Sequence, residues 1–294
     1  MPLLETVSPR GIGRIIFLII QSRKLGQLSK YFILCFVFSW TCFISVALIS
    51  RTSSAASPEL KAVQYILGLL GTIAPSLVAL WLTSRTGVPG QTEKLLGKVV
   101  KWDVNIKWYF FAASFMLVVK LSVAALYKLI TGAWPVFGQE AWLIMLVAIL
   151  VSTWVQAGEE IGWRGFALPR MSAKFGLPVS TLLLGVIWAV WHLPLFFVKG
   201  SSTFGQSFPL FFVQVTMMSV VLGWLYWRTG GSLLLTMIMH AAINNTKDIV
   251  PSSVPGATEV FALSNSLVGW LTAGLIFIFA TYCLVSMRSV RQLE

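Results

Sequence analysis

Long apolar stretches separated by short polar connectors run along most of the chain. Eight of them approach the ~20 residues that a helix needs to cross the ~30 Å hydrocarbon core of a bilayer. They are Tyr31–Ser50, Ala62–Thr83, Trp108–Leu129, Ala141–Leu168, Pro178–Val198, Phe208–Trp227, Gly231–Asn245 and Ser266–Ser286. The seventh is the shortest, so its assignment as a full crossing rests on the least sequence. The pattern predicts an all-α, polytopic membrane protein with about eight transmembrane helices.

Composition supports this class. Of 294 residues, 57% are hydrophobic and only 11% are charged, and the mean hydropathy is +0.82, which is too much apolar surface for one soluble core. The formal net charge of +12 would suggest nucleic acid in a soluble protein, but here the cations sit in the connectors beside apolar spans. We therefore expect the protein to lie in a lipid bilayer and to bind no nucleic acid. Three cysteines, all within apolar spans, predict no disulfide framework.

The chain divides into three parts. Residues 1–30 are basic and hold a short apolar run, Ile15–Ile20, which is too short to cross a bilayer and is typical of an interfacial helix. It is also a poor signal peptide, because Arg23 and Lys24 follow where small residues should lie. Residues 31–287 form a single transmembrane domain, and residues 288–294 a short tail.

The cations are distributed unevenly between the two sides. With the amino terminus inside, 15 of the 22 lysines and arginines fall on the cytoplasmic side and 5 on the other. Cytoplasmic connectors of membrane proteins carry the excess of basic residues. The count predicts an integral, multi-pass protein of the plasma membrane with both termini in the cytoplasm.

Charged residues also occur inside one span. Glu159, Glu160 and Arg164 interrupt the fourth apolar stretch, and ionisable groups at such depth suggest a functional site. Residues four apart share a helix face, so Glu160 and Arg164 can form an internal ion pair that leaves Glu159 free to face a cavity. Gly158 and Gly162 would let a neighbouring helix approach closely.

The two histidines of the chain lie in later spans. With ~1.5 Å of rise per residue, Glu159, His192 and His240 lie ~14–21 Å from the cytoplasmic ends of their helices. They could therefore meet in one layer of a cavity open to the cytoplasm. Asn244 follows His240 by four residues and shares its face.

A carboxylate near two imidazoles and an amide suits hydrolysis of an amide bond. Glu159 would act as general base on a water held by His192, and His240 and Asn244 would donate to the developing oxyanion. Alternatively Glu159, His192 and His240 could ligate one divalent metal, such as Zn²⁺, that activates the water. We favour the metal-free version, because an amide is an uncommon partner in a zinc site.

Three motifs together carry a resemblance. They are Glu159-Glu160-x-x-x-Arg164, Trp188-x-x-x-His192 and His240-x-x-x-Asn244, in this order on three spans. The set resembles the CPBP family of intramembrane proteases, which includes the CAAX prenyl endopeptidases and bacteriocin-processing or immunity proteins. The resemblance implies eight helices around a conical cavity open to the cytosol and a protease core over residues 140–246.

The resemblance also implies roles for these residues. The first Glu and the middle His would activate water, the last His and Asn would form the oxyanion site, and the family name describes metalloproteases. Glu160, Arg164 and Trp188 would support the site structurally. The family pattern more often has Phe at the position of Trp188, so we expect a changed cavity shape there. Lys120 in the third span is interpreted as snorkelling or as bound to an internal partner.

The leading hypothesis is thus an intramembrane endopeptidase acting on a membrane-associated peptide or protein. That substrate could be a prenylated CAAX tail, a leader peptide or a membrane-protein segment. A proton- or ion-coupled transporter is a second hypothesis, since Glu and His inside spans also form relays, although no repeated half supports it. A non-catalytic scaffold that binds peptides through the same cavity is a third.

Overall fold

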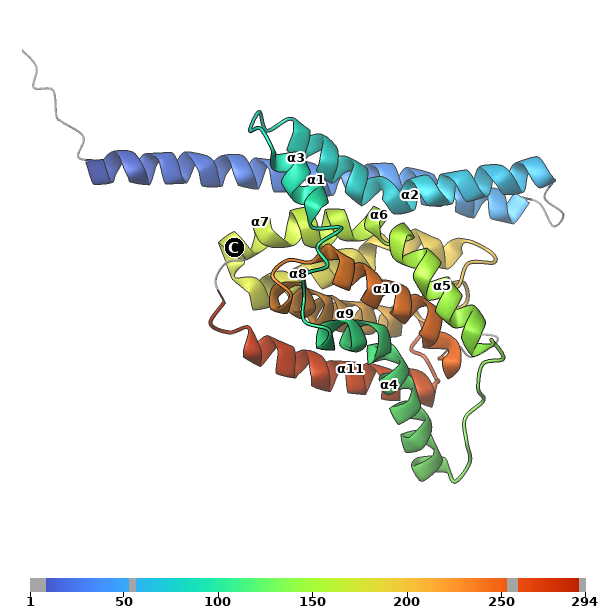
Figure 1. Ribbon diagram of the computed structural model, residues 1–294. Helices are drawn as coiled ribbons and strands as arrows, with labels where there is room; N and C mark the ends of the chain where they lie inside the picture. The colour runs from blue at the N-terminus through green and yellow to red at the C-terminus, as the bar shows by residue number, and fades with distance from the viewer. Residues whose placement is uncertain (1–8, 53–56, 253–258, 291–294) are drawn as a thin grey trace, which may run out of the picture.

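The computed structural model describes residues 9–52, 57–252 and 259–290, with side chains from Gly26 to Arg51 in the first of these ranges, and the regular secondary structure of the described part is all helical (Figure 1). The α-helices are α1 (Pro9–Thr52), α2 (Pro58–Ser84), α3 (Gln91–Gly97), α4 (Lys107–Thr131), α5 (Trp142–Val155), α6 (Ala157–Glu160), α7 (Leu168–Phe175), α8 (Leu177–Trp191), α9 (Phe208–Arg228), α10 (Leu233–Thr246) and α11 (Leu267–Ser286). A π-helix, η1 (Ile161–Ala167), joins α6 to α7, and short 3-10 turns, η2 (Leu193–Phe197) and η3 (Lys247–Ile249), follow α8 and α10.

Local sequence signals set several helix ends. Ser207, Ser232 and Ser266 each accept a hydrogen bond from the backbone N–H three residues later, at the starts of α9, α10 and α11. Such side-chain caps satisfy backbone donors that have no partner within the helix. Gly176 ends α7 with φ of 75°, a conformation that glycine adopts without steric cost. The chain then enters α8 at once, with Pro178 in its first turn.

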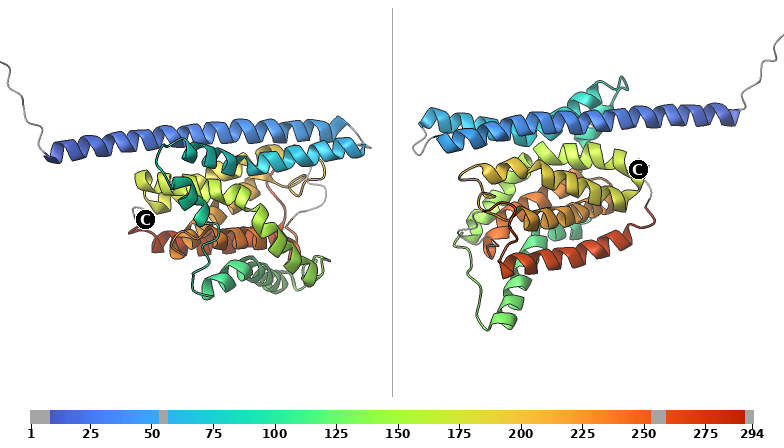
Figure 2. Two further views of the ribbon diagram at one scale, coloured as in Figure 1. Left: turned by 45° about the horizontal axis from the view of Figure 1, so that its top comes forward. Right: turned by 180° about the vertical axis from the view of Figure 1, so that it is seen from behind.

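The helices form a bundle covered on one side by a two-helix layer. α1 packs along α2, and α2 contacts α6 and η1 beneath it (Figures 1 and 2). Within the bundle α10 packs against α4, α5 and α9, and α11 packs against α4 and α9. α10 is therefore the most enclosed helix, which places the site residues that it carries inside the protein.

Seven described helices are long and apolar enough to cross a membrane, so the chain is a multi-pass, all-helical membrane protein. One of the eight predicted spans is not among these seven. The seventh stretch, Gly231–Asn245, forms α10, which has only 14 residues and a length of about 21 Å. It is too short to cross alone. Its surroundings are protein rather than lipid, since its apolar residues Leu235, Met237 and Met239 are fully buried.

The amino-terminal segment is continuous with the first span. The apolar run Ile15–Ile20, predicted to be an interfacial helix within residues 1–30, belongs to α1, whose backbone continues without a break from Pro9 to Thr52 and of which Gly26–Arg51 qualifies as a span. No proline interrupts this stretch after Pro9, so nothing in the sequence ends the helix before the span begins.

The acidic span is not one regular α-helix. Between Glu160 and Leu168 the backbone widens into η1, where the N–H of Leu168 bonds to the carbonyl of Trp163, five residues earlier. Pro169 lacks the N–H that would continue a regular ladder, and π-turns of this kind occur often at functional sites. The sequence pattern gave no sign of this change in helical register.

The two predicted glycines do permit close packing. A Cβ on Gly158 would lie 2.9 Å from the Ile73 side chain, and one on Gly162 would lie 2.6 Å from the backbone of Pro75. Both contacts are with α2, so the small residues let α2 lie directly against α6 and η1. This contact fixes the height of Glu159 and Glu160 in the bundle.

Candidate active site

Trp188 is the residue around which the predicted site residues gather. Its ring lies 5.5 Å from that of His192 and 5.2 Å from that of His240, centroid to centroid. The guanidinium carbon of Arg164 lies 4.3 Å from the centre of the same ring, within cation–π range. Trp188 lies in α8, Arg164 in η1 and His240 in α10, so one side chain links three segments.

Glu159 is held by Trp188. The indole Nε1–H of Trp188 donates to Oε2 of Glu159 at 2.8 Å, and Glu159 is only 6% exposed. No other side chain of the described residues hydrogen-bonds to this carboxylate, so Oε1 is available for a water. The expectation for Trp188 was a changed cavity shape. The structure adds a hydrogen bond that the Phe of the family pattern could not make, because a phenyl ring has no donor.

Glu160 occupies a different environment. Its Oε1 accepts from Nη1 of Arg164 at 2.8 Å and lies 2.9 Å from Nδ1 of His240. Glu160 and Arg164 are both fully buried. The predicted ion pair between residues four apart is thus present, and it includes a histidine from α10 that sequence spacing could not indicate.

The ring nitrogens of the two histidines are oriented by these partners. Nδ1 of His192 lies 2.7 Å from the backbone carbonyl of Trp188, and a carbonyl only accepts, so this nitrogen carries the hydrogen and Nε2 is left with a lone pair. Nδ1 of His240 faces a carboxylate and donates in the same way. Each histidine therefore has Nε2 free for a ligand.

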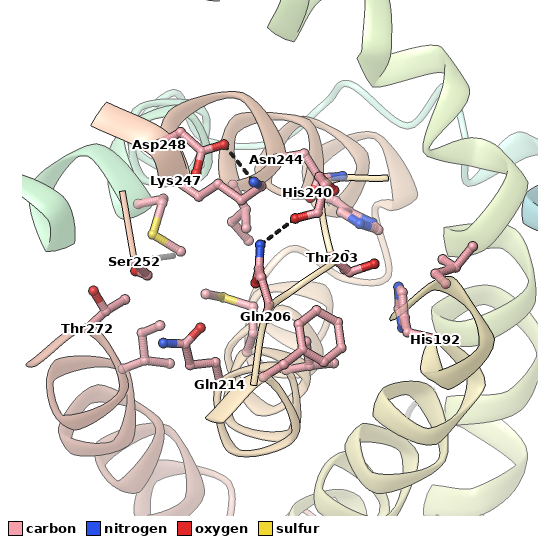
Figure 3. A pocket seen from close by; sticks show the side chains of 18 of the residues that line it. His192, Thr203, Gln206, Gln214, His240, Asn244, Lys247, Asp248, Ser252 and Thr272 are labelled. Atoms are coloured by element: carbon pink, nitrogen blue, oxygen red, sulfur yellow. Dashed lines mark hydrogen bonds and ion pairs between the residues drawn. The ribbon is translucent and has the colours of Figure 1, made fainter. Parts of the chain in front are cut away.

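A cavity of about 480 Å³ lies beside these residues and is lined by Trp188, His192, His240 and Asn244 (Figure 3). This is within the usual range for ligand-binding pockets. Glu159 was expected to face the cavity. Glu159 does not line the cavity; Trp188, whose indole holds Glu159, lines the wall in its place. Asn244 is exposed, and no hydrogen bond to another described residue holds its side chain.

The remaining wall contains polar residues that the sequence patterns did not single out. They come from the connector before α9, from α9, from the segment after α10 and from α11: Ser201, Ser202, Thr203, Gln206, Gln214, Lys247, Asp248, Ser252 and Thr272. Only Lys120 of this wall was noted beforehand. The polarity of Gln214 and Thr272 inside apolar spans is the one signal in the sequence that could have pointed to it.

The position of the cavity conflicts with one expectation. The connectors that line it, Ser201–Gln206 and Lys247–Ser252, lie at the end of the bundle opposite the carboxyl end of the described chain. The charge count assigns those connectors to the non-cytoplasmic side. An opening between these connectors would therefore lie on the side opposite to that assigned to the termini. Sequence reasoning missed this because charge counts report orientation, whereas the opening depends on how connectors pack.

The residues also bear on the metal hypothesis. Within the described ranges, no three His, Cys, Asp or Glu side chains are grouped so that they could hold a metal ion. The tentative set Glu159, His192 and His240 is therefore not grouped as a metal centre in this arrangement, and the chemistry below is built on the side chains alone.

Fold and site together define a helical membrane protein with a buried carboxylate–histidine constellation beside an internal cavity. Residues 139–246 match the family model described as Type II CAAX prenyl endopeptidase Rce1-like. The chain is also similar to CAAX prenyl protease 2 of Methanococcus maripaludis, with 29% identity over 113 residues. That alignment covers 36% of this chain and 40% of the relative. The predicted resemblance to the CAAX-type intramembrane protease family is thereby confirmed for this segment, which holds all the predicted site residues.

Proposed function

We propose that the protein is an intramembrane endopeptidase that hydrolyses a peptide bond of a membrane-associated substrate. The observation that carries the proposal is the pair of residues joined through Trp188. The indole holds one oxygen of Glu159, and the Trp188 carbonyl orients His192, so that Oε1 of Glu159 and Nε2 of His192 are both free acceptors. The matched segment 139–246 supports the same reaction class.

One water molecule can donate a hydrogen to each of the two acceptors, Oε1 of Glu159 and Nε2 of His192. The water donates one hydrogen to Nε2 of His192 and the other to Glu159, which removes it as the water oxygen attacks the scissile carbonyl carbon. Glu159 then passes this proton to the departing amine. The C–N bond breaks, and the products are a carboxylic acid, which keeps the second hydrogen of the water, and an amine.

His240 and Asn244 are proposed to stabilise the oxyanion. Nδ1 of His240 is engaged by Glu160, so only Nε2 can donate to the substrate oxygen, and this requires the imidazolium form. The charges of Glu159, Glu160, Arg164 and this imidazolium then sum to zero, which suits a site enclosed by protein within a membrane. Fixed donors aimed at a developing negative charge are usually the largest contribution in acyl-transfer catalysis.

The name of the similar archaeal protein suggests a substrate with a prenylated cysteine near its carboxyl terminus, and a peptide of that kind is the first probe to use. The full chain is reconstituted in liposomes with this peptide in water enriched in ¹⁸O, and products are identified by mass spectrometry. Cleavage should place one ¹⁸O in the new carboxylate, and Glu159→Gln should abolish it. Absence of turnover of prenylated peptides, leader peptides and peptides from membrane-protein segments would refute the proposal.

We also propose that the protein lies in the cell membrane with both termini in the cytoplasm, on the strength of the charge distribution. The cavity would then open toward the outer face. In a variant without its native cysteines, a cysteine at Ser202, which lines the cavity, should react with a membrane-impermeant thiol reagent added to intact cells. A cysteine at Lys174, in the last turn of α7, should react only after the cells are opened. The reverse pattern would show that the cavity faces the cytoplasm and that the charge count misleads.

A further inference from the structure

A buried lysine lines the cavity wall away from His192. Lys120 belongs to α4, is 2% exposed and lines the same cavity as the histidines. Two of its partners, Ser252 and Thr272, lie across the cavity from His192 (Figure 3). The reaction proposed above leaves Lys120 without a role.

Its hydrogen bonds identify the group as a donor. Nζ lies 3.0 Å from the carbonyl of Val250, 2.8 Å from Oγ of Ser252 and 3.2 Å from Oγ1 of Thr272. Thr272 donates its own hydrogen to the carbonyl of Val268, so it accepts from Lys120. Three oxygen acceptors around one nitrogen match an ammonium, which has three N–H donors and no acceptor. The hydroxyl hydrogen of Ser252 then remains free to donate to a ligand.

This cation forms no ion pair with a described residue. Among the residues that the structure describes, no carboxylate lies within ion-pair distance of Nζ. Asp248, the acid that interacts with Lys120 through space, also lines the cavity, but its Oδ2 lies 2.6 Å from Nζ of Lys247. Figure 3 draws this ion pair as a dashed line. Neutral oxygens hold the ammonium in place but do not compensate its charge. A buried charge without a counterion is costly unless a ligand supplies one.

We propose that Lys120 and Ser252 form a binding subsite for the free α-carboxylate of a peptide whose scissile bond lies at His192, His240 and Asn244. The inference rests on the proposed peptidase function and adds to it a reason for cleavage close to a carboxyl terminus. A cavity of about 480 Å³ holds a ligand of limited size. The substrate segment beyond the scissile bond is therefore short, and its terminal carboxylate supplies a counterion for the Lys120 ammonium.

Three peptides of one sequence test the subsite on the reconstituted full chain. Each carries a prenylated cysteine followed by three residues. The first ends in a free carboxylate, the second in an amide, and the third in an amide preceded by Asp, which offers a side-chain carboxylate instead. The unmodified protein should show a KM about tenfold lower for the first than for the second, with similar kcat, because a charge-assisted hydrogen bond contributes that much discrimination. A KM for the third peptide equal to that for the first would overturn the assignment to the α-carboxylate.

Substitutions then locate the effect. Lys120→Met should raise KM for the acid about tenfold and leave the amide unchanged, so that the two peptides become equal. Lys120→Arg should keep most of the preference for the acid. Lys128→Met is the matched control, because Lys128 lies on the same helix, binds the Gly132 carbonyl and does not line the cavity. If Lys120→Met raised KM equally for both peptides and also lowered Tm, Lys120 would have a structural role, and the subsite would be overturned.

A binding measurement separates this inference from the proposed function. Affinities of the acid and amide peptides are compared for Glu159→Gln and for Glu159→Gln with Lys120→Met. Tighter binding of the acid than of the amide, lost when Lys120 is replaced, would support the subsite. This holds even if the unmodified protein cleaves neither peptide, because lack of cleavage would count only against the peptidase function. Cleavage of both peptides with the same KM would keep the peptidase function and overturn the subsite.

Discussion

Glu159 and Glu160 are neighbours in the chain, but their carboxylates lie in different surroundings. Glu160 shares one oxygen between Arg164 and His240 and is sealed from solvent. Glu159 accepts a single hydrogen bond, from a tryptophan that lines the cavity, and keeps one oxygen free of partners among the described residues. Adjacent residues on a helix point ~100° apart. This difference in direction is enough to place the Glu160 carboxylate in a buried charge cluster and the Glu159 carboxylate beside a residue that lines the cavity.

The difference separates residues that take part in the reaction from residues that hold others in position. The Glu160 carboxylate is fully buried beside two cations, and its second oxygen has no hydrogen-bond partner among the described residues. Water cannot reach it as it can reach a carboxylate whose hydrogen-bond partner lines the cavity. We therefore assign water activation to Glu159 and His192. Glu160 and Arg164 hold His240 in position and balance its charge. The site thus has a reactive side, formed by Glu159 and His192, and a supporting side, formed by Glu160 and Arg164. Trp188 contacts both.

The largest effect is expected on the reactive side. Glu159→Gln and His192→Ala should each lower kcat by a factor of at least ~10²–10⁴, the usual contribution of a positioned general base. The protein should still insert and purify, because neither side chain forms an ion pair in the described structure. Turnover of the prenylated peptide and Tm are measured together. Turnover close to that of the unmodified protein in either variant would remove that residue from the reactive side.

A smaller effect on activity but a larger one on stability is expected on the supporting side. Glu160→Gln leaves Arg164 and His240 without their anion, and loss of one partner of a buried pair costs about 3–5 kcal/mol. Thermal unfolding in detergent should therefore shift downward. The double variant Glu160→Gln with Arg164→Met should recover part of the loss, because it leaves no uncompensated guanidinium. Unchanged stability with abolished turnover would place Glu160 on the reactive side as well.

The smallest effect is expected where the two sides meet. Trp188→Phe keeps an aromatic ring but removes the N–H that holds Glu159, so kcat should fall about tenfold with little change in KM or Tm. Trp191→Phe is the matched control, since the indole N–H of the buried Trp191 has no hydrogen-bond partner among the described residues. Equal kcat values in the two variants would show that the Trp188 hydrogen bond does not position Glu159.

Much of the fold could be predicted, because crossing a bilayer needs a fixed length of apolar sequence. Seven of the eight stretches became helices long enough to cross a membrane. The exception, Gly231–Asn245, has the right character but is enclosed by other helices, and local hydropathy does not report what surrounds a segment. The position of the first span was predicted, whereas its continuity back to Pro9 was not.

The site was predictable where its contacts are local. Glu160 and Arg164 pair as residues four apart do, and His240 and Asn244 line the cavity together. The link from Trp188 to Glu159 joins residues 29 apart, and Lys120 reaches Thr272, 152 residues away. Such contacts depend on how helices pack. No helical period in a single sequence encodes them.

Metal dependence tests the central claim most directly, because a general base and a metal ligand are different roles for Glu159. The purified, active protein is analysed for bound metal and assayed before and after treatment with a strong chelator. If Glu159 and His192 activate water by themselves, turnover should survive chelation and should not correlate with metal content. About one equivalent of zinc in the active protein, with activity lost on its removal and regained on its return, would contradict this assignment.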